Sequence, residues 1–190
     1  MNIKNHPTFV SVLKALKNEE VIAYPTESVF GLGCDPDSQK AVNNLLRLKQ
    51  RTQKKGLILI AASYQQLQPY INDEQVSTEQ RKKIFTSWPG HFTWVFPIST
   101  IQTPTWLSGE FNSLAVRVSS HPLVRQLCYC FGKPLVSSSA NITSQTPCRT
   151  SREVVLQFGH QLSVLSGNVG GHLKPSEIRD TLTDRLIRSG

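Results

Sequence analysis

The sequence predicts one α/β domain built on a mainly mixed β-sheet. Short apolar runs alternate with stretches of helical periodicity from one end of the chain to the other. Some neighbouring apolar runs have no helical stretch between them, which indicates antiparallel pairs beside parallel ones. No internal repeat and no linker-like composition divides the chain, so residues 1–190 are expected to form a single domain.

Five stretches are expected to be helical. The first carries an apolar stripe at helical spacing, with Thr8 as its expected cap, and Asp37 or Ser38 can cap the second. His121 and Pro122 open the fourth, and Gly132 suits its C-terminus. The expected helices cover residues 8–16, 38–48, 78–87, 121–131 and 153–158.

Seven apolar runs are expected to be strands. The clearest is Leu57–Ala61, and the run that starts at Val21 is stopped by Pro25. The expected strands cover residues 21–24, 57–61, 92–96, 114–118, 135–136, 162–165 and 186–187. Segments 25–37, 88–91 and 167–175 are punctuated by Gly and Pro and are expected to be loops, which often carry functional residues.

The composition excludes several classes of protein. No apolar run approaches the ~20 residues that span a bilayer, and residues 2–6 do not begin a secretory leader. The four cysteines contain no CxxC pair and the five histidines form no ligand pattern, so we expect no metal-binding side chains. We expect a cytoplasmic protein. Its net charge of +8 favours an anionic partner, such as a nucleotide, a nucleic acid or a membrane surface.

Two polar stretches far apart in the chain share one chemical character. Lys49 and Arg51 end a helical stretch in a run of positive charge, although such runs are usually solvated helix faces. The stretch from Ser137 to Asn141 follows an apolar strand, at the kind of sheet edge where α/β proteins bind ligands, although a plain polar loop is the alternative. If the two stretches meet in space, they suit a nucleoside triphosphate.

Two further features follow or interrupt apolar strands. Gly31 and Gly33 permit tight turns or close approach to a ligand, but the run lacks both the Walker ending and the dinucleotide fingerprint. Arg117 lies inside an apolar strand and must find an anionic partner or reach an exposed face. A structural ion pair and a substrate carboxylate fit Arg117 about equally well.

Eight short motifs in a fixed order resemble the YrdC-like family, in particular its bacterial threonylcarbamoyl-AMP synthases. The resemblance runs from Val21 to Gly190. It is most specific in a lysine-x-arginine element, matched by Lys49 and Arg51, and a serine-x-asparagine element, matched by Ser139 and Asn141. The other motifs are Tyr24-Pro25-Thr26-Glu27, Gly31-Leu32-Gly33, Lys55-Gly56-Leu57, Trp88-Pro89-Gly90, Ala115-Val116-Arg117-Val118 and Pro175-Ser176. Thr52 and His91 depart from the pattern, since the family commonly has proline there.

The resemblance implies a fold, a reaction and a set of partners. The fold would be an open, twisted sheet with flanking helices and a basic concave face. The reaction joins L-threonine, bicarbonate and ATP into threonylcarbamoyl-AMP and pyrophosphate, with Mg²⁺ bound mainly through the ATP phosphates. A tRNA-modifying transferase and its accessory proteins then use the product to modify adenosine 37 of tRNAs that read codons beginning with A.

The resemblance also implies roles for individual residues. Lys49 and Arg51 would be the catalytic cations. The residues that would hold ATP are Lys49, Arg51, Lys55, Ser139, Asn141 and Arg188. The residues that would hold threonine are Thr26, Arg117, Ser137 and Ser176, with Arg117 facing the carboxylate. No protein ligand for a metal is implied.

Two other hypotheses compete with this enzyme. An RNA-binding module would use the same basic face for tRNA, ribosomal RNA or double-stranded RNA, but the strongest basic run contains no aromatic residue to stack on bases. A structural subunit with a decayed site is the third hypothesis. The intact set of Lys49, Arg51, Ser139 and Asn141 argues against it.

Overall fold

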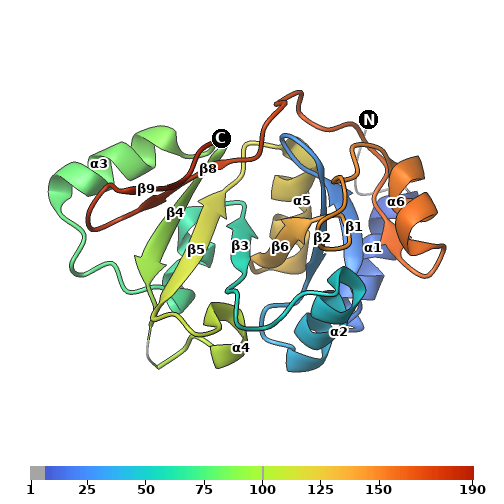
Figure 1. Cartoon of the computed structure of the whole chain (residues 1–190), viewed down its shortest axis with the longest axis horizontal. Coiled ribbons are helices and arrows are strands. Elements are labelled where there is room, and N and C mark those ends of the chain that lie inside the picture. Colours follow the sequence, from blue (N-terminus) through green and yellow to red (C-terminus); the bar gives the residue numbers. More distant parts are fainter. Residues whose placement is uncertain (1–6, 100) are drawn as a thin grey trace.

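Nine strands form one sheet in the order β7-β1-β2-β6-β3-β5-β4-β8-β9 (Figure 1). The computed structural model describes residues 7–99 and 101–190, so the expectation that residues 2–6 begin no leader lies outside the described residues. The strands are β1 (Ile22–Pro25), β2 (Phe30–Cys34), β3 (Ile58–Ala61), β4 (Phe92–Pro97), β5 (Ser113–Val118), β6 (Leu135–Ser139), β7 (Ser163–Val164), β8 (Glu177–Asp180) and β9 (Leu186–Arg188). Parallel and antiparallel pairs occur together, so the predicted mixed sheet is confirmed.

All five predicted helices are present. The helices are α1 (Pro7–Lys17), α2 (Gln39–Lys49), α3 (Thr78–Ser87), α4 (Thr105–Ser108), α5 (Pro122–Phe131) and α6 (Ser151–Phe158), with short 3₁₀ turns η2 (Tyr64–Gln66) and η3 (Gln68–Tyr70). Ser38 caps α2, since its hydroxyl accepts a hydrogen bond from the Ala41 amide. The prediction for Thr8 was wrong. Helix α1 begins at Pro7, and proline is common at the first position of a helix. Thr8 lies within the first turn.

Two strands and one short helix were missed. Strand β2 lies inside the segment 25–37 that was expected to be a loop, because two glycines in five residues weaken the pattern of a strand. Strand β8 was missed since its Glu-Ile-Arg-Asp sequence carries one apolar residue, and α4 has only four residues. Strand β6 also continues through Ser139, so the first residues of the expected serine loop belong to the sheet.

One face of the sheet is covered over only part of its length. Helices α1 and α5 pack together and contact β1, and their core includes Ile60 and Leu135. Alternate residues of a strand point to one face, so Ser137 and Ser139 lie on the same face as Leu135 but beyond the helices. Because Ser137 stands opposite Ile58 and Gly33 in the neighbouring strands, this uncovered half lies over the middle of the sheet.

The opposite face is covered by the larger apolar core. Helix α2 contacts β2, and α4 contacts both α2 and β5. Leu32, Leu59, Val116 and Val136 are fully buried in this core. No helix in residues 7–99 and 101–190 combines the length and apolarity needed to cross a bilayer.

We expect Gly33→Ala to destabilise the fold by about 1–3 kcal/mol, the usual cost of overpacking. A Cβ at Gly33 would lie 2.6 Å from the carbonyl oxygen of Val136 and 2.7 Å from the Tyr24 ring. Urea denaturation would measure the change. Gly31→Ala is the matched control, since its nearest contact would be 3.3 Å, and equal losses in both variants would contradict the steric argument.

Candidate functional site

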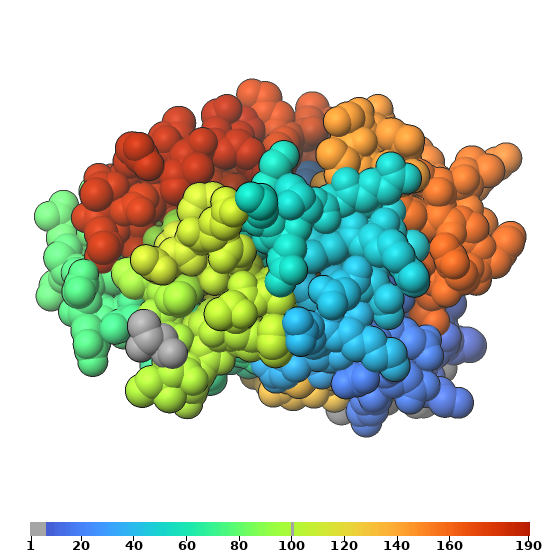
Figure 2. Space-filling view, turned by 60° about the horizontal axis from the view of Figure 1, so that its bottom comes forward, coloured from blue at the N-terminus to red at the C-terminus, as the bar shows by residue number. Residues whose placement is uncertain are grey.

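A cleft of about 820 Å³ opens over the uncovered half of the sheet. Its floor is formed by strand residues such as Ile58, Ala115 and Ser137, and its rim by three loops and the C-terminal strand. In the space-filling view, residues around 50–60 (cyan), the 140s (orange) and the C-terminal segment (red) border a hollow on this side of the molecule (Figure 2). Segments from distant parts of the sequence therefore meet at one site.

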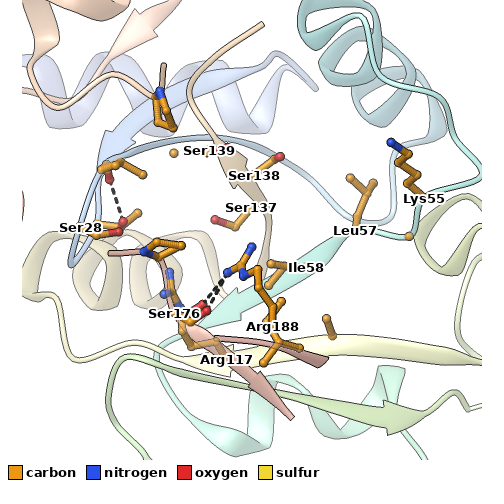
Figure 3. Close-up of a pocket in the computed structure, with 18 of the residues that line it drawn as sticks. Ser28, Lys55, Leu57, Ile58, Arg117, Ser137, Ser138, Ser139, Ser176 and Arg188 are labelled. Atoms are coloured by element: carbon orange, nitrogen blue, oxygen red, sulfur yellow. Dashed lines mark hydrogen bonds between the residues drawn. The ribbon is translucent and has the colours of Figure 1, made fainter. Parts of the chain in front are cut away.

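The lining of the cleft is positively charged. Five basic residues line it, and none of the described lining residues is Asp, Glu or His. The basic residues are Arg51, Lys55, Arg117, Arg149 and Arg188. Arg117 and Arg188 lie together near Ser176, whereas Lys55 lies on the opposite side (Figure 3). The arrangement can surround an anion with several charged groups.

The two polar stretches singled out in the sequence do meet. The Lys49 ammonium donates hydrogen bonds to the backbone carbonyl of Ser139 and, at 2.8 Å, to that of Asn141. The hydroxyl of Thr143 returns a bond of 2.8 Å to the Lys49 carbonyl. The end of α2 is thus fastened to the end of β6.

Lys49 and Asn141 stand behind the wall of the cleft and are not among its lining residues. Lys49 is 3% exposed, and burial together with the neighbouring Arg51 lowers the pKa of its ammonium to about 8. The Asn141 side chain accepts a hydrogen bond of 2.6 Å from the Ser139 hydroxyl and donates to the carbonyls of Ile142 and Gln145. Both residues shape the loop that presents Ser139.

Arg51, Lys55, Ser139 and Arg188 do line the cleft. Arg51 donates to the carbonyls of Lys55 and Gly56 at 3.0 Å each, while its buried Nε has no partner among the described residues. Burial lowers the pKa of Arg51, and burial and then Arg117 lower that of Arg188. Arg51 is therefore held by one of its nitrogens and keeps others for a ligand.

All four residues expected to hold threonine line the cleft. The buried Tyr24 hydroxyl donates to the Ser137 hydroxyl at 2.9 Å, which leaves the Ser137 proton free to point elsewhere. The Ser176 hydroxyl lies 2.8 Å from that of Thr93, and Arg188 donates to the Ser176 carbonyl at 2.7 Å. The remaining two, Thr26 and Arg117, come from the turn after β1 and from β5.

Arg117 has the structural partner that its buried position requires. Its guanidinium lies 3.5 Å from Glu27 Oε2, and both side chains are less than 10% exposed. Glu27 Oε1 accepts bonds from the Ser119 hydroxyl at 2.6 Å and the Ser120 amide at 3.1 Å. Burial raises the pKa of Glu27, but Arg117 and the bonds from Ser119 and Ser120 outweigh burial, and the net direction is downward. Since Arg117 also lines the cleft, the ion pair leaves room for a ligand on its other side.

Four contributors to the site were missed in the sequence. Ser28 and Arg149 line the cleft, Glu27 pairs with Arg117, and Tyr24 supports Ser137. Glu27 could have been found, because Arg117 needs an acidic partner and Glu27 lies in a motif after a strand. Arg149 carried no such signal, since it precedes an ordinary helix cap at Thr150.

The comparisons with known proteins agree with this geometry. The family model Sua5_yciO_yrdC, described as "Telomere recombination", matches residues 14–190. The chain belongs to this Sua5/YciO/YrdC family. Curated family members named threonylcarbamoyl-AMP synthase, from Yersinia pestis (strain Pestoides F) and Yersinia pseudotuberculosis serotype O:1b (strain IP 31758), are 61% identical over 187 residues, which is 98% of each chain.

Solved structures of the Sua5/YciO/YrdC family share the fold. P. abyssi Sua5 with the changes H234A/Y235A matches with a TM-score of 0.87 at 24% identity, covering 95% of this chain and 55% of that one. P. abyssi Sua5 complexed with L-threonine matches with a TM-score of 0.83 at 25% identity, covering 91% and 50%. E. coli YciO matches with a TM-score of 0.81 at 21% identity, covering 96% and 88%. The chain spans about half the length of the Sua5 proteins.

We expect Glu27→Gln to lower the free energy of unfolding at pH 7 by about 3 kcal/mol, because breaking a buried pair leaves Arg117 without its counter-charge. The folded-state pKa of Glu27 is lowered, so the stabilisation is present above the unfolded pKa and is lost as pH falls through the folded value. Urea denaturation from pH 7 down to pH 3 would show the difference between wild type and variant shrinking in acid.

Glu110→Gln is the control for this measurement. Glu110 also pairs with a cation, Lys54 at 2.9 Å, but its side chain is 63% exposed, so its loss should cost less than about 1 kcal/mol. Equal effects of the two changes would show that burial of the Glu27 pair is unimportant.

Proposed function

We propose that this chain makes threonylcarbamoyl-AMP from L-threonine, bicarbonate and ATP, with release of pyrophosphate. The observation that carries the proposal is the cleft: five basic residues surround hydroxyl-lined strand ends, and the described lining contains no acidic residue. The curated relatives named threonylcarbamoyl-AMP synthase cover nearly the whole chain. The same activity makes the chain a nucleotidyltransferase that serves the modification of adenosine 37 in tRNA.

ATP is bound by residues around the end of β6, together with Arg188 from the side of the cleft where Arg117 and Ser176 lie. Arg51, Lys55 and Arg188 offer charged donors to the phosphates, and Ser139 offers a hydroxyl. Charge grows on the α-phosphoryl oxygens and on the leaving pyrophosphate during the transfer, and fixed cations stabilise it. Arg51 acts in catalysis because two backbone carbonyls fix one of its nitrogens, while its other nitrogens remain free to donate hydrogen bonds to a ligand.

Lys49 and Asn141 contribute to the same site, although both lie behind the wall of the cleft. The Lys49 ammonium is occupied by the carbonyls of Ser139 and Asn141, so direct contact with ATP requires it to exchange a carbonyl for a phosphate oxygen. Its catalytic contribution is then a buried positive charge next to the phosphates together with a fixed loop. Asn141 orients the Ser139 hydroxyl.

Threonine is bound on the side of the cleft that Arg117 occupies. Arg117 faces the carboxylate, while Thr26, Ser137 and Ser176 surround the rest of the molecule. The relative solved with L-threonine is a family member that aligns over 91% of this chain. Arg117 therefore combines both roles considered for it, since it pairs with Glu27 and keeps donors for a carboxylate.

The reaction needs no nucleophile from the protein. The neutral amine of threonine attacks bicarbonate, which forms an N–C bond and releases water, so that a carbamate results. A carbamate oxygen then attacks the α-phosphorus of ATP, and the bond to the departing pyrophosphate breaks. Holding the two substrates in line is the main task of the site.

Mg²⁺ would enter with ATP. The described lining offers hydroxyl oxygens but no carboxylate, so the donor set fits an ion that keeps its water and phosphate ligands. When bound, Mg²⁺ would neutralise charge on the phosphates. No side chain is assigned to it.

The partners follow from the product. A mixed anhydride of a carbamate and AMP hydrolyses readily, so a tRNA-modifying transferase with its accessory proteins receives it in the cytoplasm. Contact with tRNA or double-stranded RNA through the basic rim is the alternative function. A titration with salt separates the two, because binding across many phosphates weakens steeply as salt rises.

The activity is tested by mass spectrometry of the protein incubated with ATP, Mg²⁺, bicarbonate and L-threonine, with each component omitted in turn. We expect an adenylate that requires all substrates. Lys55→Ala should raise the KM for ATP about tenfold or more, since a charge-assisted hydrogen bond is lost. Lys54→Ala is the matched control, because Lys54 is exposed, pairs with Glu110 and does not line the cleft. A folded protein that binds ATP but makes no adenylate would refute the proposed function.

Arg117→Gln should raise the KM for threonine about 10- to 100-fold and change the KM for ATP much less, because it removes the partner of one substrate's carboxylate. Steady-state kinetics with each substrate varied would measure the split. Glu27→Gln separates the two roles of Arg117, the ion pair with Glu27 and the contact with threonine, because it keeps the guanidinium but removes the carboxylate that pairs with it. Equal rises in both KM values for Arg117→Gln would mean that Arg117 does not select threonine.

A further inference from the structure

One segment crosses the whole upper edge of the sheet beside the threonine side of the cleft. Residues 165–176, here called the crossing segment, connect β7 to β8, and six strands lie between these two in the sheet. Figure 1 shows it along the top of the molecule (orange to red). Backbone bonds fix its middle to the turn after β1: the Gly170 amide donates to the Thr26 carbonyl at 2.9 Å, and the His172 amide donates to the Glu27 carbonyl at 3.0 Å.

His91 links the crossing segment to Arg117. Its Nε2 lies 3.0 Å from the carbonyl oxygen of Lys174, and its Nδ1 lies 3.4 Å from Arg117 Nη1. A carbonyl oxygen only accepts and a guanidinium only donates. Nε2 must therefore carry the proton and Nδ1 must offer its lone pair, which is one defined tautomer of the neutral ring.

Stacking also fixes the His91 ring. His91 stacks on His172 of the crossing segment with centroids 4.3 Å apart and planes at 24°. The His91 ring thus joins the crossing segment to Arg117 through both of its nitrogens and one of its faces.

The charges around His91 come from three elements. Arg117 lies on β5, His172 on the crossing segment and Glu27 on the turn after β1. Burial lowers the pKa of His91, Arg117 and His172 lower it further, and the Lys174 carbonyl and Glu27 oppose them. Protonation of Nδ1 would place a donor against the donor of Arg117 and add a positive charge beside it.

We propose that His91 is a positioning residue for threonine: its neutral ring holds the Arg117 guanidinium from one side while Glu27 holds it from the other. Loss of the Nδ1 lone pair in acid frees Arg117 from this support. Threonine use by this enzyme therefore weakens as His91 becomes charged, whereas ATP use does not. The threonine part of this inference rests on the proposed function.

The kinetic test compares wild type with His91→Gln between pH 5.5 and 8. A glutamine amide supplies a donor and an acceptor but does not titrate. We expect the ratio of the KM for threonine of wild type to that of His91→Gln to rise about tenfold toward acid pH, as for one lost hydrogen bond. Protonation of the threonine amine affects both proteins alike and cancels in this ratio. His160→Gln is the control, since His160 is exposed and should keep the wild-type profile. An unchanged acid rise in His91→Gln overturns the proposal.

A second histidine variant separates His91 from its neighbour. His172→Gln should keep the acid rise but move its midpoint to higher pH, because the His172 ring, which lowers the pKa of His91, is gone. If His172→Gln abolishes the rise and His91→Gln does not, the titrating group is His172 and the proposal fails.

A measurement without turnover decides the structural part separately. Long-range ¹⁵N–¹H NMR, with His91 identified by the signal missing in His91→Gln, should show a neutral ring protonated at Nε2 at pH 7.5. In Arg117→Gln the pKa of His91 should rise, because Arg117 lowers it in wild type. A proton on Nδ1, or a pKa indifferent to Arg117, overturns the link. Absence of adenylate at every pH, with these NMR results obtained, would refute the proposed function instead.

Discussion

The need to neutralise a guanidinium buried in the middle of the sheet organises this protein. Arg117 belongs to a central strand and is 7% exposed, so most of its surface is shielded from water. Its counter-charge comes from Glu27, which lies in the turn between β1 and β2, several strands away in the sheet order. The turn must therefore bend over the strand ends, and its carbonyls then receive the amides of the crossing segment. One ion pair thereby fixes the wall of the threonine side.

A second buried cation organises the opposite side in a different way. The Lys49 ammonium has no carboxylate partner in the part of the chain that is described and is satisfied by two backbone carbonyls. Such a charge is costly to bury, and its lowered pKa is the measure of that cost. In return, the loop after β6 has a defined shape. Two cations thus fix the walls of the cleft: Lys49 from behind the wall, and Arg117 from within the lining, where it also keeps donors for a ligand.

The sequence predicted the chemistry of the site better than its geometry. Apolar periodicity located all five long helices. The sequence left open whether Lys49 meets the Ser139–Asn141 stretch, and the structure brings the end of helix α2 and the end of strand β6 together. Apolar periodicity does not reveal a glycine that is needed because neighbouring groups approach its backbone closely. Gly33 lets β2 approach β6 and the Tyr24 ring, and the same glycine made β2 resemble a loop. The direction of the Lys49 side chain was equally hidden, since it depends on carbonyls 90 residues away.

The absence of Asp, Glu and His from the described lining also bears on how the proposed reaction handles protons. Free threonine carries an ammonium, and only its neutral amine can attack bicarbonate. A side-chain base would remove that proton, but nearby positive charges favour the same loss by lowering the pKa of the bound ammonium. The second proton of the amine leaves in the water formed from bicarbonate, so no further acceptor is needed. Arg117 and Arg188 can thus hold anionic groups and prepare the nucleophile at once. Glu27 and His91 remain behind the wall, where they position Arg117 and do not compete for the proton.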